Sequence, residues 1–415
     1  MNKKTKKVAI FVDGVFIPSH SGAANRFHYL TRTLQKHTDT EMIVILCDRG
    51  WSSPKQISRE KFKTYLLHPS LYKDIEFLGK ILAKEKVNII QFANLETAVE
   101  VGIQLSHKLN IHVIFESHYE DYEFAKSVGA DEATLIKIKY LQNNFGKYFD
   151  KIISLSDEDI QSENNLKIDP ATVAVIPSGV NISDFPISCF NLNSKKLICF
   201  GNLYFEANLK TIKQIKKVMY GEMSILGFRF HMIGDISPKD KNNLEDKNFI
   251  VTGKQENLFK SFNKTTIGLA PVTDGSGIRI KILNYLNAGI PVITTSQGAR
   301  GFKRKDLLII EDDINNYSNL IIKLISEKNY ILRLSKEGRK FIRSEMSWEK
   351  ISEMVSEQYN STLLMPVNDK SSALKRIQSI EFNEPSWIKE MIDKKRYKRN
   401  MPFVKKNDYV ILYHK

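Results

Sequence analysis

A chain of 415 residues is long enough for two ordinary domains, and its 42% hydrophobic and 10% aromatic content excludes a disordered or fibrous protein. The three cysteines, Cys47, Cys189 and Cys199, are scattered, which argues against a disulfide framework or a cysteine-bound metal. The net charge of +15 favours phosphate-bearing ligands, anionic membrane surfaces or nucleic acid. Because no nucleic-acid-binding motif occurs, no nucleic-acid partner is expected.

The N-terminus combines a basic segment, Met1–Lys7, with an apolar run that superficially resembles a signal peptide. Asp13 and Gly14 interrupt the run and no small-residue cleavage site follows, so a first β-strand is predicted instead. No run approaches the roughly 18 apolar residues that a membrane span needs. The protein is therefore expected to be cytoplasmic, either soluble or peripheral on the inner face of the plasma membrane.

Short apolar strands alternate with amphipathic helical patterns through the first half of the chain. Such alternation predicts βαβ units and a parallel sheet. The predicted strands are Lys7–Asp13, Met42–Cys47, Val87–Phe92, His112–Glu116, Lys151–Leu155 and Val173–Ile176, and helices are predicted at Ala23–Gln35, Leu95–Lys108 and Ala133–Tyr148.

Several polar residues follow these strands, where ligands bind in parallel sheets. Arg26, in the loop HSGAANRF, could be a phosphate-binding cation or a helix surface charge. His118 follows the fourth strand, and a lone histidine of this kind is more often structural. Asp157 and Asp159 form an Asp-x-Asp pattern, but they resemble an acidic helix start, which is stable without a metal. No metal site is predicted.

The second half repeats the alternation after a polar, Asn- and Pro-containing segment, 181–194, which is predicted to be an interdomain linker. The predicted strands of this half are Leu197–Phe200, Phe228–Ile233, Phe249–Val251, Ile267–Ala270, Val292–Thr295 and Leu307–Ile310. The domain prediction is a first Rossmann-like domain over 1–180, a linker over 181–194 and a second Rossmann-like domain over 195–345.

The C-terminal part divides into one predicted helix, within 346–365, and a basic extension over 366–415. From Asp369 to Lys415 there are twelve Lys or Arg and six Asp or Glu, and KKRYKR mixes aromatic and basic residues. The extension could dock on an anionic membrane surface or a protein partner. The alternative is a solvated, partly ordered tail.

The most informative segment is DGSGIRIKILNYLNAGIPVITTSQGARGF, from Asp274 to Phe302. It predicts a glycine loop, a helix, a turn, a buried strand and a second glycine loop. The first loop lets backbone N–H groups approach a ligand, and the helix after it directs its positive end to the same place. Arg279 and Lys281 lie in its first turn, where cations are unfavourable without an anion. The segment predicts a phosphate or diphosphate site, with an ordinary βα turn as the alternative.

This segment resembles the C-terminal-domain signature of retaining GT-B glycosyltransferases, in particular family 4. The positions in register are Gly275, Ser276, Gly277, Arg279, Lys281, Leu283, Gly289, Pro291, Val292, Thr295, Gly298, Ala299 and Gly301. IPSGVNISDF, Ile176–Phe185, resembles a second family motif. The resemblance implies a GT-B fold: α/β, with two Rossmann-like domains facing a central cleft, and a C-terminal helix that packs back on the first domain.

The resemblance also implies roles for individual residues. His118 would contact the transferred sugar, and Arg279 and Lys281 would neutralise the leaving diphosphate. No metal or other cofactor is obligatory, and the donor is a UDP- or GDP-sugar. The residues expected to bind the donor are Ser21, Gly22, Gly179, Lys210, Gly253, Ser276, Gly277, Ile278 and Asn284.

Two departures from the family pattern bear on activity. Asn284 stands where the family has the glutamate that binds the ribose, and Ser276 stands at the earlier acidic position. Asparagine can still hydrogen-bond a ribose hydroxyl, but the charge-assisted bond is lost, which weakens donor binding by about tenfold.

The expected function is retaining transfer to a saccharide, lipid-linked or protein-linked acceptor, in bacterial surface polysaccharide or glycoconjugate synthesis. The alternatives are a non-catalytic GT-B accessory subunit of a partner glycosyltransferase and a nucleotide-sugar epimerase.

Overall fold

The computed structural model divides the chain into two compact units. The first unit comprises Met1–Pro177 and Trp348–Lys415, and the second comprises Ser178–Ser347. The residues described are 6–18, 22–118, 121–127, 129–158, 169–204, 206–255, 257–273, 279–382 and 402–413.

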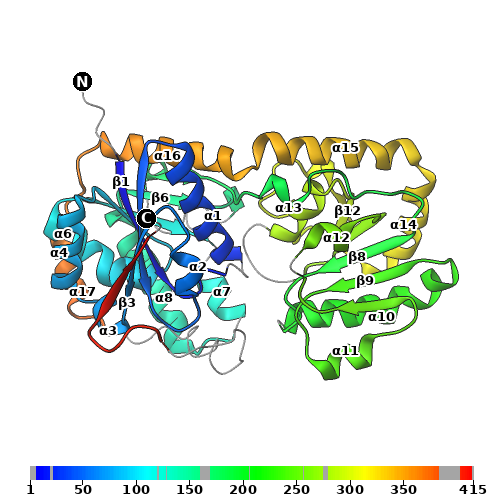
Figure 1. The fold of residues 1–415 in the computed structure, drawn as a ribbon, viewed down its shortest axis with the longest axis horizontal. Helices are drawn as coiled ribbons and strands as arrows, with labels where there is room; N and C mark the ends of the chain where they lie inside the picture. Colours follow the sequence, from blue (N-terminus) through cyan, green and yellow to red (C-terminus); the bar gives the residue numbers. More distant parts are fainter. Residues whose placement is uncertain are drawn as a thin grey trace. The chain divides into compact units, whose positions relative to one another are not determined.

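The first unit is built on an eight-stranded sheet in the order β14-β3-β2-β1-β4-β5-β6-β7, with every pairing parallel except that of β14 with β3. Figure 1 labels β1, β3 and β6 of this sheet. All six strands predicted in the first half are present within a residue or two, whereas β3 and β14 were not predicted. The strands are β1 (Lys6–Asp13), β2 (Thr40–Cys47), β3 (Lys63–Leu67), β4 (Ile89–Phe92), β5 (His112–Ser117), β6 (Lys151–Ser154), β7 (Val173–Val175) and β14 (Tyr409–Leu412).

Both faces of this sheet are covered, which explains why its central strands are mostly apolar. Alternate residues of β1 point to opposite faces: Ala9 and Phe11 belong to one buried cluster, and Val8 and Ile10 to the other. The helices are α1 (Gly22–His37), α2 (Pro54–Ile57), α3 (Pro69–Tyr72), α4 (Ile75–Glu85), α5 (Leu95–Thr97), α6 (Ile103–Leu109), α7 (Asp121–Ser127), α8 (Glu132–Phe145), α16 (Trp348–Leu363) and α17 (Ser371–Ile377). A π-helical turn, Ala98–Gly102, joins α5 to α6 inside the single helix predicted there.

The second unit has a parallel six-stranded sheet in the order β10-β9-β8-β11-β12-β13. All six strands predicted for this half are present. They are β8 (Lys196–Phe200), β9 (Arg229–Ile233), β10 (Phe249–Thr252), β11 (Ile267–Ala270), β12 (Val292–Thr294) and β13 (Ile309–Ile310). The helices of this unit are α10 (Glu206–Ile225), α11 (Pro238–Leu244), α12 (Leu258–Phe262), α13 (Ile280–Asn287), α14 (Tyr317–Ser326) and α15 (Lys328–Glu345).

The division into units differs from the predicted domain boundaries. The segment 181–194, predicted to be a linker, lies inside the second unit. Its backbone is bonded there, since the Cys189 N–H donates to the Ala288 carbonyl at 2.8 Å and the Asn191 N–H to the Thr265 carbonyl at 2.8 Å. The chain passes between the units at Pro177–Ser178 and again at Ser347–Trp348.

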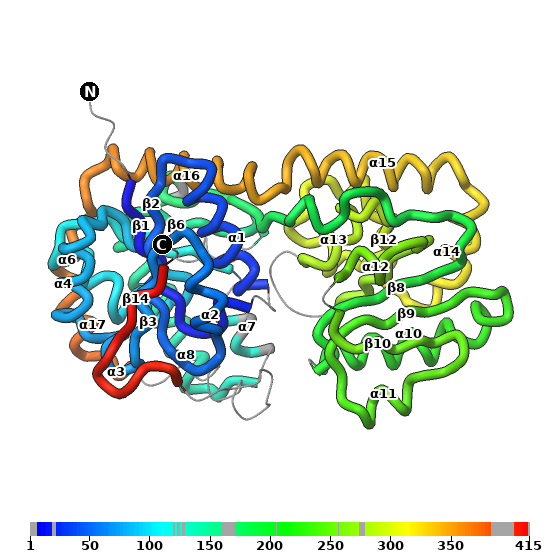
Figure 2. The backbone as a smooth tube through the Cα atoms, viewed as in Figure 1, coloured from blue at the N-terminus to red at the C-terminus, as the bar shows by residue number. Residues whose placement is uncertain are grey.

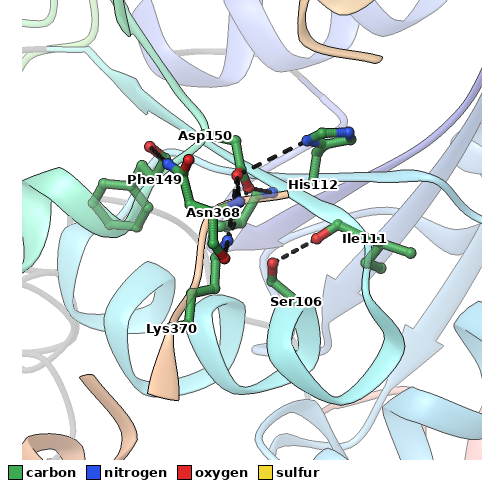
Figure 3. A network of polar contacts seen from close by, with 8 residues as sticks. Ser106, Ile111, His112, Phe149, Asp150, Asn368 and Lys370 are labelled. Carbon is green, nitrogen blue, oxygen red and sulfur yellow. Dashed lines mark hydrogen bonds and ion pairs between the residues drawn. The ribbon is translucent and has the colours of Figure 1, made fainter. Parts of the chain in front are cut away.

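Part of the C-terminal extension folds onto the first unit through a buried ion pair (Figure 3). The Lys370 ammonium, 0% exposed, lies 3.1 Å from the Asp150 carboxylate, which also accepts the N–H groups of Val113 and Asn368. Burial alone would raise the pKa of Asp150, but its contacts with His112, Lys370 and these backbone groups hold it below the usual range. Residues 368–370 are therefore held to Asp150, the residue that precedes β6.

The last described segment covers an edge of the same sheet. β14 pairs antiparallel with β3, as the red tube beside β3 shows in Figure 2. The Val404 N–H donates to the buried Asp48 carboxylate at 2.7 Å, and the rings of Tyr65 and Tyr409 stack 6.2 Å apart. The segments 366–382 and 402–413 are therefore ordered against the first unit, although most of their residues are exposed. KKRYKR, at 394–399, lies outside the described residues.

Within the described part of the chain, no helix has the length and apolarity needed to cross a membrane.

Candidate functional site

The first unit contains a buried polar cluster formed by Arg26, Gln91, Glu116, His118 and Tyr359. Glu116 lies near the end of β5 and is 1% exposed. Its carboxylate accepts Nε of Arg26, from α1, on one oxygen and Nε2 of Gln91, from β4, on the other. A carboxylate buried this deeply is stable only when it is paired and hydrogen-bonded. We call this group the Arg26–Glu116 cluster.

Helix α16, the first helix after the chain returns to this unit, adds a further contact to the cluster. The Tyr359 hydroxyl, on α16, donates to Oε1 of Gln91 at 2.5 Å, so the Gln91 amide is oriented with its nitrogen toward Glu116. Burial alone would raise the pKa of Glu116, but the charges of Arg26 and His118 lower it to about 2. Glu116 therefore carries a fixed negative charge at any physiological pH.

His118 lies at this cluster, directly after β5. Its side chain is nearly buried, and Nε2 is 3.8 Å from the Glu116 carboxylate, which is longer than a hydrogen bond. No described residue hydrogen-bonds this Nε2. The ring packs against Phe27 of α1, with centroids 5.0 Å apart. The imidazole thus has a fixed position, with Nε2 at ion-pair distance from Glu116 and without a hydrogen bond to any described residue.

Arg26 is not a helix surface charge, because it is 1% exposed. Its Nη1 donates to the Pro177 carbonyl at 2.7 Å, which connects the first turns of α1 with the IPSG motif. Its Nη2 is buried and has no acceptor among the described residues. Gly22 is the first residue of α1, and Ser21 lies outside the described residues.

In the second unit, Arg279 and Lys281 begin α13, where the sequence predicts them. Arg279 occupies the N-cap position, and the Lys281 ammonium donates to the Asn208 side chain of α10 at 3.1 Å. Burial, together with repulsion from Arg279, lowers the pKa of Lys281. A Cβ atom at Gly201, just after β8, would be 3.5 Å from this ammonium. Lys281 therefore lies at the carboxyl end of β8, beside Gly201, which has no side chain.

Glycines and threonines shape the same end of this sheet. A Cβ atom at Gly234, after β9, would be 1.7 Å from the Gly201 carbonyl oxygen. At Gly298, in the second glycine loop, a Cβ atom would be 2.1 Å from Oγ1 of Thr294. The Thr295 hydroxyl accepts the Gly298 N–H at 2.9 Å and donates to the Val272 carbonyl. These contacts bring the second glycine loop against the residues that precede 274–278.

The remaining predicted donor-binding residues are scattered over the second unit. Asn284 is half-buried in α13 and donates its amide to the Ile280 carbonyl at 3.0 Å. Lys210 is exposed on α10, and Asn208, not Lys210, contacts Lys281. Gly253 follows β10, where a Cβ atom would meet no described atom within 4 Å. Gly179 is buried next to Val180, whose N–H donates to the Met346 carbonyl at 2.8 Å.

Some of the predicted donor-binding positions lie outside the described residues. Ser276, Gly277 and Ile278 lie outside the described residues, and so does Asp159 of the Asp-x-Asp pattern. Among the residues that are described, no group of three or more His, Cys, Asp or Glu gathers as metal ligands would.

Sequence reasoning did not identify Gln91, Tyr359 or Asn208 as parts of these sites, and it placed Glu116 only at the end of a predicted strand. Tyr359 is 268 residues from its partner Gln91, so no local pattern signals the contact. A polar residue inside an apolar run was the available signal, as Gln91 in IIQF of β4 and Glu116 in HVIFES of β5 illustrate.

The two halves of the chain match glycosyltransferase families. Residues 20–184 match the family model described as Glycosyltransferase Family 4, and residues 194–327 match the one described as Glycosyl transferases group 1. These matches support the predicted resemblance, because each half of the chain is similar to a glycosyltransferase domain of these families. A search of curated proteins found no match.

Solved structures with the same fold include three whose own chains are covered almost completely. A glycosyltransferase from Rickettsia africae is 16% identical with a TM-score of 0.69, over 87% of this chain and 99% of its own. Sucrose-phosphate synthase from Thermosynechococcus elongatus is 15% identical with a TM-score of 0.67, over 86% and 99%. HepE from Anabaena, in complex with UDP and glucose, is 13% identical with a TM-score of 0.63, over 86% and 100%. The predicted GT-B fold is confirmed.

Proposed function

We propose that this protein is a retaining glycosyltransferase of the EC 2.4 class that takes a sugar from a nucleotide-diphospho-sugar, UDP- or GDP-linked. The acceptor is a saccharide, or a lipid-linked or protein-linked glycan, in bacterial surface polysaccharide or glycoconjugate synthesis. The protein acts in the cytoplasm, peripherally at the inner face of the plasma membrane. No metal or other cofactor is required.

The observation that carries this proposal is the position of Lys281. A desolvated ammonium and the neighbouring Arg279 lie at the start of a helix, at the carboxyl end of a parallel sheet. Cations at a helix N-terminus oppose the helix dipole, and the same N-terminus attracts anions, so a bound anion there is stabilised by both. A nucleotide diphosphate supplies that anion, and the charge that develops on it during transfer is stabilised by the same groups.

The first unit supports the sugar-contacting role of His118. Retaining transfer builds positive character on the sugar, and no strong base is needed if the departing phosphate takes the acceptor proton. Glu116 keeps its negative charge, and Arg26 and Gln91 hold it in place behind His118. In this proposal His118 binds the sugar, while the Arg26–Glu116 cluster fixes its position.

Two neighbours by fold support the substrate classes. Structures of HepE from Anabaena contain UDP with glucose, or UDP-glucose. WaaG, described as a glycosyltransferase involved in lipopolysaccharide biosynthesis, is 13% identical with a TM-score of 0.60, over 85% of this chain and 99% of its own.

Calorimetric titration with UDP, GDP, ADP and CMP, each also as a sugar conjugate, tests the proposal. We expect one nucleotide to bind with micromolar affinity, and Lys281→Ala to weaken that binding by about a hundredfold, because a buried charge-assisted contact is lost. Lys217→Ala, an exposed lysine of α10, is the matched control and should bind as the wild type does. Undiminished binding by Lys281→Ala would contradict the diphosphate assignment.

The alternative of a non-catalytic accessory subunit is favoured by one observation. Asn284, at the position of the family glutamate, gives its amide hydrogen to the Ile280 carbonyl of its own helix. If no nucleotide binds to folded protein and a partner glycosyltransferase co-purifies, this alternative replaces the enzyme. Release of free epimerised nucleotide sugar, without an acceptor product, would instead identify an epimerase.

A further inference from the structure

The second unit contains a pocket at the amino-terminal ends of its strands, away from the carboxyl ends that hold Lys281. Its volume is about 530 Å³. Lys196 begins β8, Arg229 begins β9, and Asn263 and Lys264 lie in the loop before β11. Neither the glycine loops nor α13 contributes to its lining.

Strand register explains why basic side chains converge here. Lys196 pairs with Arg229 and Ile198 with His231 across the parallel strands β8 and β9. Paired residues, and residues two apart, point to the same face of a sheet. Lys196, Arg229 and His231 therefore project from one face at one end of the sheet. Lys264, which also lines the pocket, has the left-handed backbone conformation, with φ of 55°.

The charges in the pocket are of one sign. The residues that line it include Lys196, Arg229 and Lys264 but no carboxylate, and no described ion pair involves any of the three. Burial and the adjacent Arg229 lower the pKa of Lys196. Burial, with the charges of Lys196 and Arg229, lowers the pKa of His231 to about 4. Burial is the larger cause of both shifts, and the neighbouring cations act in the same direction.

The walls of the pocket are fixed by hydrogen bonds. The Lys196 ammonium donates to the Ser261 carbonyl at 2.6 Å and to the Asn263 carbonyl at 3.1 Å. An ammonium has three donors, so a third N–H is left for a ligand. On the other side, the Ser194 hydroxyl bonds the Asn191 carbonyl at 3.1 Å and the Thr266 hydroxyl at 3.0 Å. Little ordering is needed when a ligand enters such a site.

We infer that this pocket binds a small phosphate monoester joined to a polar, hydroxyl-bearing group, such as a sugar phosphate. Arg229, Lys264 and the third N–H of Lys196 bind the phosphate oxygens, and the neutral His231 adds a hydrogen bond. The amides of Asn193 and Asn263 suit the hydroxyl groups. The inference does not depend on the proposed function, because none of these residues takes part in the site around Lys281.

The test follows the imidazole resonance of His231 by NMR to obtain the pKa of this side chain. Inorganic phosphate and, separately, glucose 1-phosphate are added at constant ionic strength. The His231→Gln variant assigns the resonance. A bound anion stabilises the imidazolium, so saturating phosphate should raise the pKa of His231 by about one unit. The double variant Arg229→Ser/Lys264→Ser should weaken binding at least about tenfold. Lys217→Ser/Lys239→Ser, which removes two exposed lysines outside the pocket, should bind as the wild type does.

Two outcomes would overturn the inference: no change at His231 up to about 50 mM phosphate, or the same change in the Arg229→Ser/Lys264→Ser variant, which would indicate general screening. Vesicles of phosphatidylglycerol form a separate arm. If they shift His231 and soluble phosphate does not, the ligand is a lipid headgroup and the small-molecule assignment is wrong. UDP titration of the same double variant keeps the two proposals separate, because nucleotide binding should be unchanged there.

Discussion

The Arg26–Glu116 pair illustrates how much one buried contact can determine. Both side chains are 1% exposed, and each neutralises the charge of the other, which would otherwise be unpaired in the core. The pair also connects α1, β4, β5 and, through Tyr359, α16. Removing this pair should therefore lower the stability of the first unit and change the position of His118.

Glu116→Gln should destabilise the first unit in a pH-dependent way. A carboxyl with a pKa of about 2 in the folded state, against an ordinary value near 4.5, contributes on the order of 3 kcal/mol at neutral pH. That contribution is lost as the pH falls from about 4.5 toward 2. The difference in free energy of unfolding between wild type and variant should thus be about 1 kcal/mol smaller at pH 3.5 than at pH 7.

Urea unfolding followed by tryptophan fluorescence measures this difference. No tryptophan of the sequence lies within Ser178–Ser347, and Trp51 and Trp348 are buried in the first unit, so the signal does not come from the second unit. Glu41→Gln is the control, because Glu41 forms a half-exposed ion pair with Lys7 and such pairs contribute at most about 1 kcal/mol. A difference that does not change with pH would contradict the role assigned to the Glu116 charge.

Gly234→Ala should destabilise the second unit by about 1–3 kcal/mol, since the new Cβ atom would overlap the Gly201 carbonyl. The displaced strand ends should also reduce nucleotide binding. Gly253→Ala is the matched control for stability, as its Cβ atom meets no described atom within 4 Å. Scanning calorimetry compares the two. Equal melting temperatures for the two variants would contradict this prediction, because the backbones after β8 and β9 would then separate with little loss of stability.

At the scale of elements, the C-terminal segment is part of the first unit because of specific contacts, and the Lys370–Asp150 ion pair is the most buried of them. Lys370→Met should cost about 3–5 kcal/mol, because it leaves the Asp150 carboxylate without its cation. The double variant Lys370→Met/Asp150→Asn should be less destabilised than the single one. The half-exposed Lys350→Met serves as control. A double variant as unstable as the single one would show that packing of residues 368–370, not charge, dominates.

Element prediction from sequence succeeded where the signal is local. Every central strand is an apolar run with a turn at each end, and Trp348–Leu363 has clear helical periodicity. β3 was missed because KTYLL follows the charged segment REKFK. β14 was missed because it lies in a basic extension and its partner β3 is more than 300 residues away in sequence. Pairing at that distance leaves no local pattern.

The sites were predictable to a similar degree. Arg279, Lys281 and His118 were found because they follow or begin recognisable elements. The residues that support them, such as Tyr359 and Asn208, come from other elements, and only three-dimensional packing brings them close. The roles of Ser21, Ser276, Gly277 and Ile278 stay predictions, since these residues lie outside the described part of the chain.

At the scale of the whole molecule, the second unit is an insertion in the first. Its sheet and both of its buried clusters are formed by residues within Ser178–Ser347. A fragment with these bounds should therefore fold alone, whereas residues 1–177 alone should not, because they lack α16 and β14. Circular dichroism with thermal melts of the two fragments measures this. A cooperative transition in 1–177 would contradict the expected dependence on the C-terminal residues.

This order of units has a consequence during translation. The ribosome releases the second unit as a complete stretch of chain. The first unit is completed only when Trp348–Lys415, 68 residues, have also been synthesised. Until β14 emerges, the outer edge of β3 has exposed backbone N–H and C=O groups, which can pair with the edge of another nascent chain. Synthesis at about 5–20 residues per second makes that interval many seconds long. Chaperones that cover strand edges should thus raise the yield of this protein more than they raise the yield of its isolated second unit.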